Sequence, residues 1–108
     1  MTYVLEKAVK DEAQKYFEGT ELETAIGMLE STPLPMDQAA PPPRVHIAVL
    51  WLAEGNIKKL ASEIENASCD WRDTLLAAGL ADENWPELMA AKGINALGWL
   101  QKAAGPNK

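Results

Sequence analysis

Apolar residues recur every three or four positions along most of the chain, which is the period of an α-helix with one buried face. The first stripe predicts a helix over residues 3–18, and its apolar members are Leu5, Val9, Ala13, Tyr16 and Phe17. A second helix is expected from Leu22 to Leu29, because Thr20 and Glu23 stand at capping-box spacing just after Gly19. Residues 1–30 therefore predict an N-terminal helical hairpin.

A proline-rich linker is expected over residues 31–43, which hold five of the seven prolines. Proline lacks a backbone N–H and pushes the preceding residue toward an extended conformation, so no helix can run through this segment. The simpler interpretation of Pro41–Pro43 is a semi-rigid spacer, and a docking site for a proline-binding module is the alternative. From Val45 to Ala53 the third expected helix is apolar on nearly every face, which is typical of the middle of a bundle or of a subunit interface.

The main helical unit is expected over residues 44–104, with further short helices separated by Gly55, Gly79 and Gly93. The expected N-caps of these helices are Asn56, Ser68 or Asp70, and Asn84 followed by Pro86. Strict alternation of apolar and polar residues is missing, so no sheet is expected. The prediction is a single all-α domain over residues 1–108, a small bundle of five to seven short helices.

Composition places the chain among ordinary globular proteins, with 47% hydrophobic and 24% charged residues in 108. The single cysteine, Cys69, cannot form an internal disulfide, which fits a reducing compartment. The longest apolar run, Val45 to Ala53, is far shorter than the roughly 20 residues of a membrane span. With no apolar core of a signal peptide at the N-terminus, these features predict a cytoplasmic protein that does not enter a membrane.

The net charge of −6 is unevenly distributed. Residues 1–43 carry three lysines against eight acids, a net charge of −5, whereas residues 44–108 carry seven bases against eight acids, a net charge of −1. Acidic surfaces repel phosphate groups, so nucleic acid and anionic lipid are not expected as partners. A protein partner with a basic surface is expected instead.

Residues that could carry chemistry are few. His46 is the only histidine, and metal binding would need companions that the sequence lacks, so no metal or other cofactor is expected. A Cys69–His46 nucleophile pair has no support from spacing, and Asp70 and Asp73 are explained by capping and by the helix dipole. We therefore expect no catalytic residue and a protein that is not an enzyme.

Four tryptophans in 108 residues are many, and tryptophan is enriched at protein-binding hot spots. Trp51 and Trp71 lie in periodic helices and are expected mainly in the core, while Trp85 could be either a packing residue or an exposed anchor. The candidate interaction surface consists of Trp51, Trp85, Trp99, Arg72 and Asp73.

Two resemblances bear on function. Residues 55–80 resemble a helix-turn-helix of the factor-for-inversion type, but the helix that would enter the groove, Asp70-Trp71-Arg72-Asp73, carries one base and two acids.

Residues 44–80 resemble a group of small uncharacterised bacterial proteins that share the pattern RxxxAVLxLxxG[ND] followed by D[WFY]RDxL. That resemblance implies that residues 44–80 form the family unit, and it assigns no activity.

The leading hypothesis is a non-enzymatic helical domain that binds another protein or itself. A homodimer is expected, because a third helix that is apolar all round needs more cover than a few short helices readily give, and the hairpin could pack across the interface. One alternative is a helix-turn-helix regulator. Another is a small enzyme in which Arg72, Asp73 and His46 of two chains converge at a dimer interface.

Overall fold

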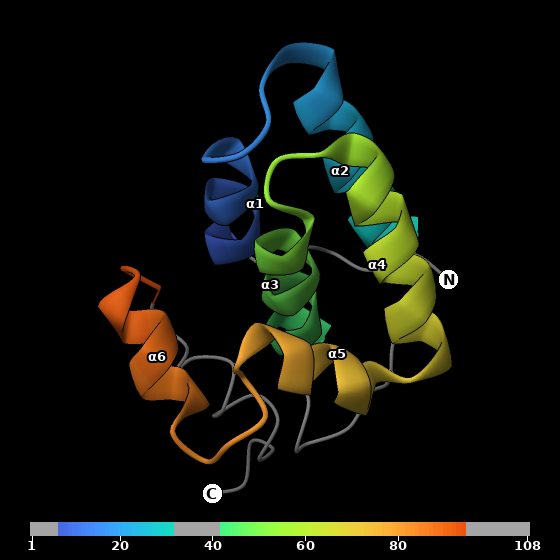
Figure 1. Ribbon diagram of the computed structural model, residues 1–108. Coiled ribbons are helices and arrows are strands. Elements are labelled where there is room, and N and C mark those ends of the chain that lie inside the picture. Colours follow the sequence, from blue (N-terminus) through green and yellow to red (C-terminus); the bar gives the residue numbers. More distant parts are fainter. Residues whose placement is uncertain (1–6, 32–41, 95–108) are drawn as a thin grey trace, which may run out of the picture.

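A computed structural model describes residues 7–31 and 42–94, and within this part of the chain it contains six α-helices and no strand (Figure 1). The helices are α1 (Lys7–Gln14), α2 (Gly19–Ser31), α3 (Pro42–Ala53), α4 (Ile57–Cys69), α5 (Trp71–Ala78) and α6 (Trp85–Ala91). The predicted all-α bundle of five to seven helices is confirmed. No helix of the described residues is both long enough and apolar enough to span a bilayer.

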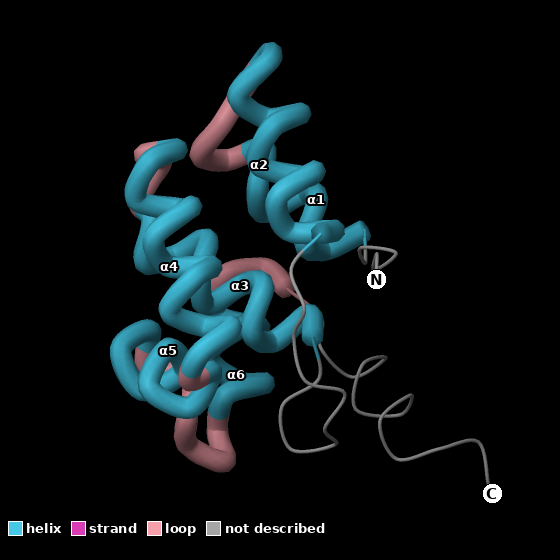
Figure 2. The backbone as a smooth tube through the Cα atoms, turned by 90° about the vertical axis from the view of Figure 1, so that its right-hand side faces the viewer, coloured by secondary structure: helices cyan, strands magenta, loops and turns pink. Residues whose placement is uncertain are grey.

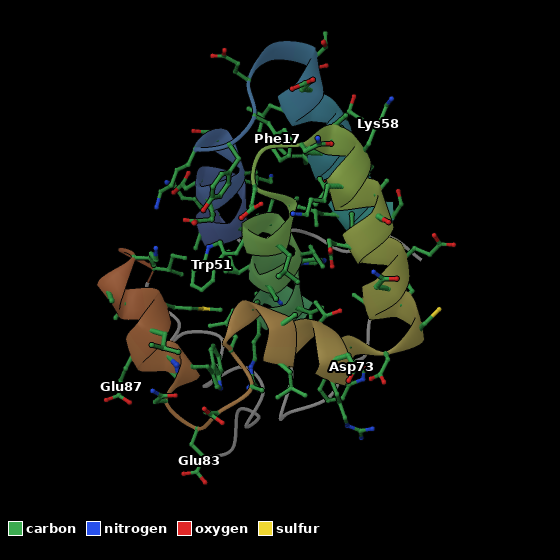
Figure 3. All side chains as sticks on the ribbon, in the orientation of Figure 1. Phe17, Trp51, Lys58, Asp73, Glu83 and Glu87 are labelled. Atoms are coloured by element: carbon green, nitrogen blue, oxygen red, sulfur yellow. The ribbon has the colours of Figure 1, made fainter. Side chains whose placement is uncertain are left out.

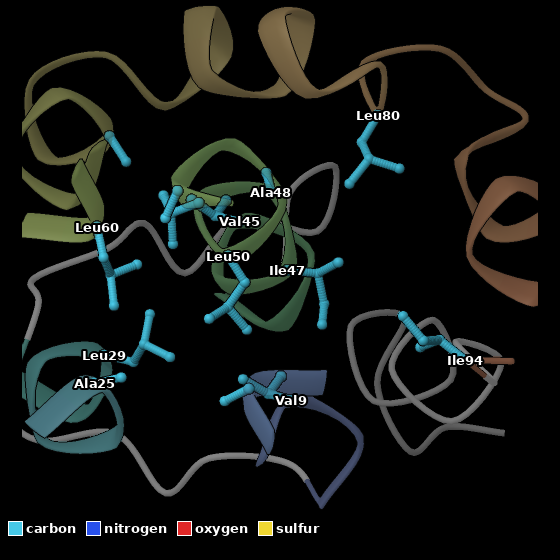
Figure 4. Close-up of a cluster of buried hydrophobic side chains, with 14 of the residues drawn as sticks. Val9, Ala25, Leu29, Val45, Ile47, Ala48, Leu50, Leu60, Leu80 and Ile94 are labelled. Atoms are coloured by element: carbon cyan, nitrogen blue, oxygen red, sulfur yellow. The ribbon is translucent and has the colours of Figure 1, made fainter. Parts of the chain in front are cut away.

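Helix α3 forms the centre of the domain, and the close-up in Figure 4 shows its side chains surrounded by those of the other elements. Every residue from Arg44 to Leu50 is buried, and Ile47, Ala48 and Leu50 have no exposed surface. The apolar side chains that pack around α3 include Val9, Ala25, Leu29, Leu60, Leu80 and Ile94. The expectation that Val45–Ala53 lies in the middle of the bundle is confirmed for the described residues.

The N-terminal hairpin packs on the rest of its own chain, with α1 against α3 and α2 against α4 (Figures 1 and 2). Helix α1 ends at Gln14, earlier than the apolar stripe predicts, and the following turn carries Phe17 into the core with 3% of its surface exposed. Helix α2 begins at Gly19, whose φ of 62° lies in the left-handed region. Thr20 therefore lies in the first turn of α2 and not at the predicted N-cap position.

Burial of α3 inside one chain bears on the expected homodimer. The homodimer is expected because α3 needs cover, but helices α1, α4 and α5 of the same chain supply this cover. The burial of α3 therefore gives no support for a homodimer, which remains a prediction. Sedimentation of the full chain tests it, because a particle near the monomer mass of 11.8 kDa would contradict it.

The predicted helix boundaries from α4 onward are largely confirmed. Asn56 caps α4 by accepting a hydrogen bond from the Lys59 N–H at 3.0 Å. Asp70, and not Ser68, caps α5. Asn84 occupies the predicted N-cap position of α6, with Pro86 in the first turn, but its side chain makes no cap hydrogen bond. Gly93, with a φ of 84°, lies just after the end of α6. The helix expected beyond it, with Trp99, lies outside the described residues.

Candidate functional site

Helix α5 is fixed at its N-terminal end by Asp70, which joins it to α4 without an intervening loop. The Asp70 N–H donates to the carbonyl of Asn66 at 2.8 Å, which closes α4. The Asp70 carboxylate accepts a hydrogen bond from the Arg72 N–H at 3.1 Å, which starts α5. One residue thus ends one helix and begins the next, so the direction of α5 is set by α4.

The C-terminal end of α5 is held by a glycine cap and by an arginine from α3. Gly79 adopts a φ of 80°, which lets the Leu80 N–H donate back to the Leu75 carbonyl at 2.9 Å. The Arg44 Nε donates to the Leu80 carbonyl at 3.0 Å, and its guanidinium lies 4.7 Å from the centroid of the Trp85 ring. Burial lowers the pKa of Arg44 below its ordinary value. Arg44 therefore ties α3 to the end of α5 and to the start of α6.

The two faces of α5 differ sharply. Thr74 and Leu75 are buried against the domain, with Trp71 and Ala78 partly covered beside them. The opposite face carries the exposed residues Arg72, Asp73, Leu76 and Ala77, which we call the α5 face. Leu76 is 65% exposed, and the other exposed large hydrophobic among the described residues, Leu88 on α6, is 38% exposed. Since residues three and four apart share one side of a helix, Arg72 and Asp73 flank Leu76.

The predicted interaction residues that the structure describes do not share one surface. Arg72 and Asp73 are exposed on the α5 face, as a binding surface requires. Trp85 is only 6% exposed and lies beneath the Arg44 guanidinium, so its assignment to the surface is wrong. Trp51 is half-buried where α1 meets α3, far from Asp73 in Figure 3, and Trp99 lies outside the described residues. Sequence reasoning missed Leu76, which the structure adds to this set.

A second polar cluster surrounds the buried carboxylate of Glu12 on α1, which is 2% exposed. One carboxylate oxygen accepts hydrogen bonds from the Trp51 indole N–H at 2.8 Å and from the Tyr16 hydroxyl at 3.3 Å. The other oxygen pairs with Lys15 Nζ at 2.8 Å, and Lys15 also donates to the carbonyl of Lys92 at 3.2 Å. Because both oxygens are engaged and covered, Glu12 joins α1 to α3 and is not presented to a substrate.

Burial is the main cause of a raised pKa at the Tyr16 hydroxyl, and the nearby Glu12 charge and hydrogen bond raise this pKa further. The phenol therefore stays protonated at neutral pH and remains a donor to Glu12. This cluster is a structural connection between the hairpin and α3.

Removing the indole donor should weaken that connection. We expect Trp51→Phe to lower the free energy of unfolding by about 1–3 kcal/mol, because it leaves a buried carboxylate short of one hydrogen bond. Trp71→Phe is the matched control, since the Trp71 indole N–H makes no hydrogen bond to any described residue. Urea denaturation of both variants measures the difference, and equal losses would contradict this role for Glu12.

His46 lies in the core with 2% of its surface exposed. Burial lowers its pKa from the ordinary 6.5 to about 4, against a smaller opposing effect of a hydrogen bond to the backbone of Leu29. Cys69 is exposed at the end of α4, and Arg72 and Asp73 are exposed on α5. The structure therefore does not bring His46 together with Cys69, nor does it present His46 at a surface where Arg72 and Asp73 of a second chain could meet it.

No group of three or more His, Cys, Asp or Glu side chains arranged to hold a metal ion occurs among residues 7–31 and 42–94. Comparisons of the chain with protein-family models, with characterised proteins and with solved structures found no match.

Proposed function

We propose that this domain is a non-enzymatic protein-interaction module that binds its partner through the α5 face. The single observation that carries the proposal is Leu76, which exposes 65% of its surface on a helix that is capped at both ends. Burying a leucine side chain is worth about 1.5–3 kcal/mol, and a partner that covers Leu76 would gain much of that.

The position of the α5 face also supports this function. Helix α5 is attached to α4 through Asp70 and to α3 through Arg44, so the exposed side chains project from a fixed support. A preorganised surface loses less conformational entropy on binding than a loop does. Exposed leucine flanked by charged side chains resembles the apolar centre and polar rim of protein interfaces.

The proposal is tested by affinity purification from cells that express the chain natively, followed by binding of the purified partner. We expect Leu76→Ser to abolish recovery of a specific partner and to leave the melting temperature nearly unchanged. Leu88→Ser is the matched control, because it makes the same change at an exposed leucine on α6. A partner that survives Leu76→Ser but is lost with Leu88→Ser would assign binding to another face.

A helix-turn-helix regulator is the alternative class, because α4 and α5 follow one another in the segment that resembles such a motif. Asp70 alone joins these helices, however, whereas a helix-turn-helix has a turn of about three or four residues. The face that α5 presents to solvent carries Arg72 beside Asp73, with Asp70 at the helix start. Base readout and phosphate contacts require Arg, Lys, Asn or Gln in these positions.

We expect no binding to duplex DNA or RNA in a mobility-shift assay at physiological salt. The physical reason is repulsion between phosphate groups and a chain of net charge −6. Sub-micromolar, salt-dependent binding of any duplex would restore the regulator hypothesis.

A further inference from the structure

We propose that residues 86–94, which we call the clasp, open from the domain as one unit while helices α1–α5 stay folded. In the closed state the cluster around Glu12 fastens the C-terminal end of the clasp. Opening gives solvent access to Trp51 and to one side of α3. This conformational device is separate from the α5 face and does not depend on the proposed function.

The clasp is held by few buried side chains. Of its residues only Met89 and Ile94 are buried, and the others are partly or fully exposed. The helix pairs with the most extensive packing combine α1 to α5 with one another, and α6 belongs to none of them. Figure 1 shows α6 at the edge of the molecule, on the side of α3 away from α4. A helix as short as α6 is not stable alone, so it unfolds once these contacts are lost.

Polar contacts attach the C-terminal end of the clasp to the Glu12 cluster. Lys15 Nζ lies 2.8 Å from a Glu12 carboxylate oxygen and donates to the carbonyl of Lys92 at 3.2 Å. Lys92 Nζ lies 5.8 Å from the centroid of the Trp51 ring, and the indole N–H of Trp51 donates to Glu12 at 2.8 Å. Through Lys15 and through Trp51, the end of the clasp is thus joined to the same buried carboxylate.

The two ends of α6 are held unequally. At its start, Trp85 is buried and the buried Arg44 guanidinium lies over its ring. At its end, the Lys15 side chain is 53% exposed and Lys92 is also exposed. Contacts of exposed lysines are weak, because water competes for the ammonium group and the long side chain loses conformational entropy. We therefore expect the clasp to open from Lys92, with Trp85 as the fixed end.

Opening uncovers apolar surface on the side of α3 that the clasp covers. Met89 has no exposed surface and Ile94 has little, so both lose their apolar surroundings when the clasp leaves. Figure 4 shows Ile94 on the side of α3 toward which Ile47 points. Trp51, which lies between α1 and α6 in Figure 3, loses Lys92 from its ring. The closed clasp therefore restricts access to this side of α3.

Native-state hydrogen exchange of the full chain, followed by NMR at increasing urea concentrations, tests the opening. The reporters are the amides of Leu88, Lys92 and Ile94, whose N–H groups donate to backbone carbonyls of residues 84 and 89. We expect these amides to exchange at least about tenfold faster than those of α3, with one common and weaker dependence on urea. Rates that rise steadily from Leu88 to Ile94 would indicate fraying of a chain end. The same urea dependence for the clasp and α3 would indicate a single cooperative unit, and either result would overturn the proposal.

Met89→Asp provides a second measurement, because it places a charge at the buried centre of the clasp. We expect the clasp amides to lose their protection, while α3 stays protected and the remaining helices still unfold cooperatively in urea. Leu88→Asp is the matched control, since Leu88 is exposed on the same helix, and it should leave the clasp closed. Loss of protection throughout the domain in Met89→Asp would mean that α6 is integral to the fold, contrary to the proposal.

Lysine variants test the fastening. Lys92→Met removes the cation over Trp51, and Lys15→Met removes the hydrogen bond to the Lys92 carbonyl. Each should speed the exchange of the clasp amides about threefold. Lys10→Met is the matched control, because it makes the same change in charge at an exposed position of α1, and it should change these rates less than about twofold. Equal effects of all three variants would indicate a response to overall charge and would overturn the role of the Glu12 cluster.

Discussion

Leu50→Asp should unfold the domain or bring it close to unfolding. Leu50 has no exposed surface and lies in α3, which the other helices surround. The substitution removes about 3–5 kcal/mol of apolar packing and adds a carboxylate that has no partner in the core. A domain of ordinary stability, about 5–15 kcal/mol, has little in reserve after such a loss. Helical circular dichroism during thermal and urea denaturation measures the effect.

The control for this prediction is the same change on the α5 face. Leu76→Asp places an equal charge at a leucine that is 65% exposed, so its effect on the free energy of unfolding should stay within about 0.5 kcal/mol. If Leu50→Asp melts within a degree or two of the wild type, α3 is not the centre of the domain and the described architecture is wrong.

Acid should destabilise the domain through His46. Its pKa is about 4 in the folded state, lowered from the ordinary 6.5 mainly by burial. Between these two values the unfolded chain takes up a proton that the folded chain does not, so stability falls as the pH is lowered from about 6.5 to 4. At about 1.4 kcal/mol for each pKa unit, the full loss is about 3 kcal/mol. Above pH 6.5 both states are neutral at this position and the contribution is constant.

The measurement compares urea unfolding of the wild type and of His46→Leu across this pH range. Carboxylates contribute to acid unfolding in both proteins, so the difference between the two curves isolates His46. We expect the variant to lose about 3 kcal/mol less than the wild type on going from pH 7 to pH 4. Parallel curves would show that His46 is protonated equally in the folded and unfolded states.

The fold follows from the sequence because its helices differ in their apolar pattern. The apolar run of Val45–Ala53, interrupted only by His46, predicts a position in the middle of the bundle or at a subunit interface, and the structure places it inside the bundle. Asn56 and Gly79 have side-chain and backbone preferences that mark helix ends in any context. The end of α1 was harder to predict, because the apolar stripe continues past Gln14 into a turn that carries Phe17 into the core.

The candidate site was only partly predictable. Arg72 and Asp73 are among the residues that the sequence predicts for an interaction surface, whereas Leu76 is not. The signal was available, since Trp71, Leu75 and Ala78 follow the helical spacing and Leu76 falls one position outside it. Glu12 likewise stands three residues after Val9, within an apolar stripe. Its covered position depends on Trp51, which is 39 residues away and which no local pattern connects to it.

Local charge was hidden by averaging. Over residues 44–108 the net charge of −1 hides the net charge of −3 of residues 70–84, because the other residues of this part carry six basic against four acidic groups. The fold places Asp73 and Glu83 at one end of the molecule and Lys58 at the other (Figure 3). Which side chains share a surface depends on the packing of the helices, and helical periodicity does not predict that packing.

Site-specific photo-crosslinking tests the central claim, that a protein partner covers the α5 face, most directly. Benzoylphenylalanine is placed at position 76 in one protein and at position 58, an exposed lysine of α4, in another, and both are irradiated in the native cells. We predict a discrete crosslinked species from position 76 and none from position 58. No crosslinked protein from position 76, or the same products from both positions, would contradict the claim.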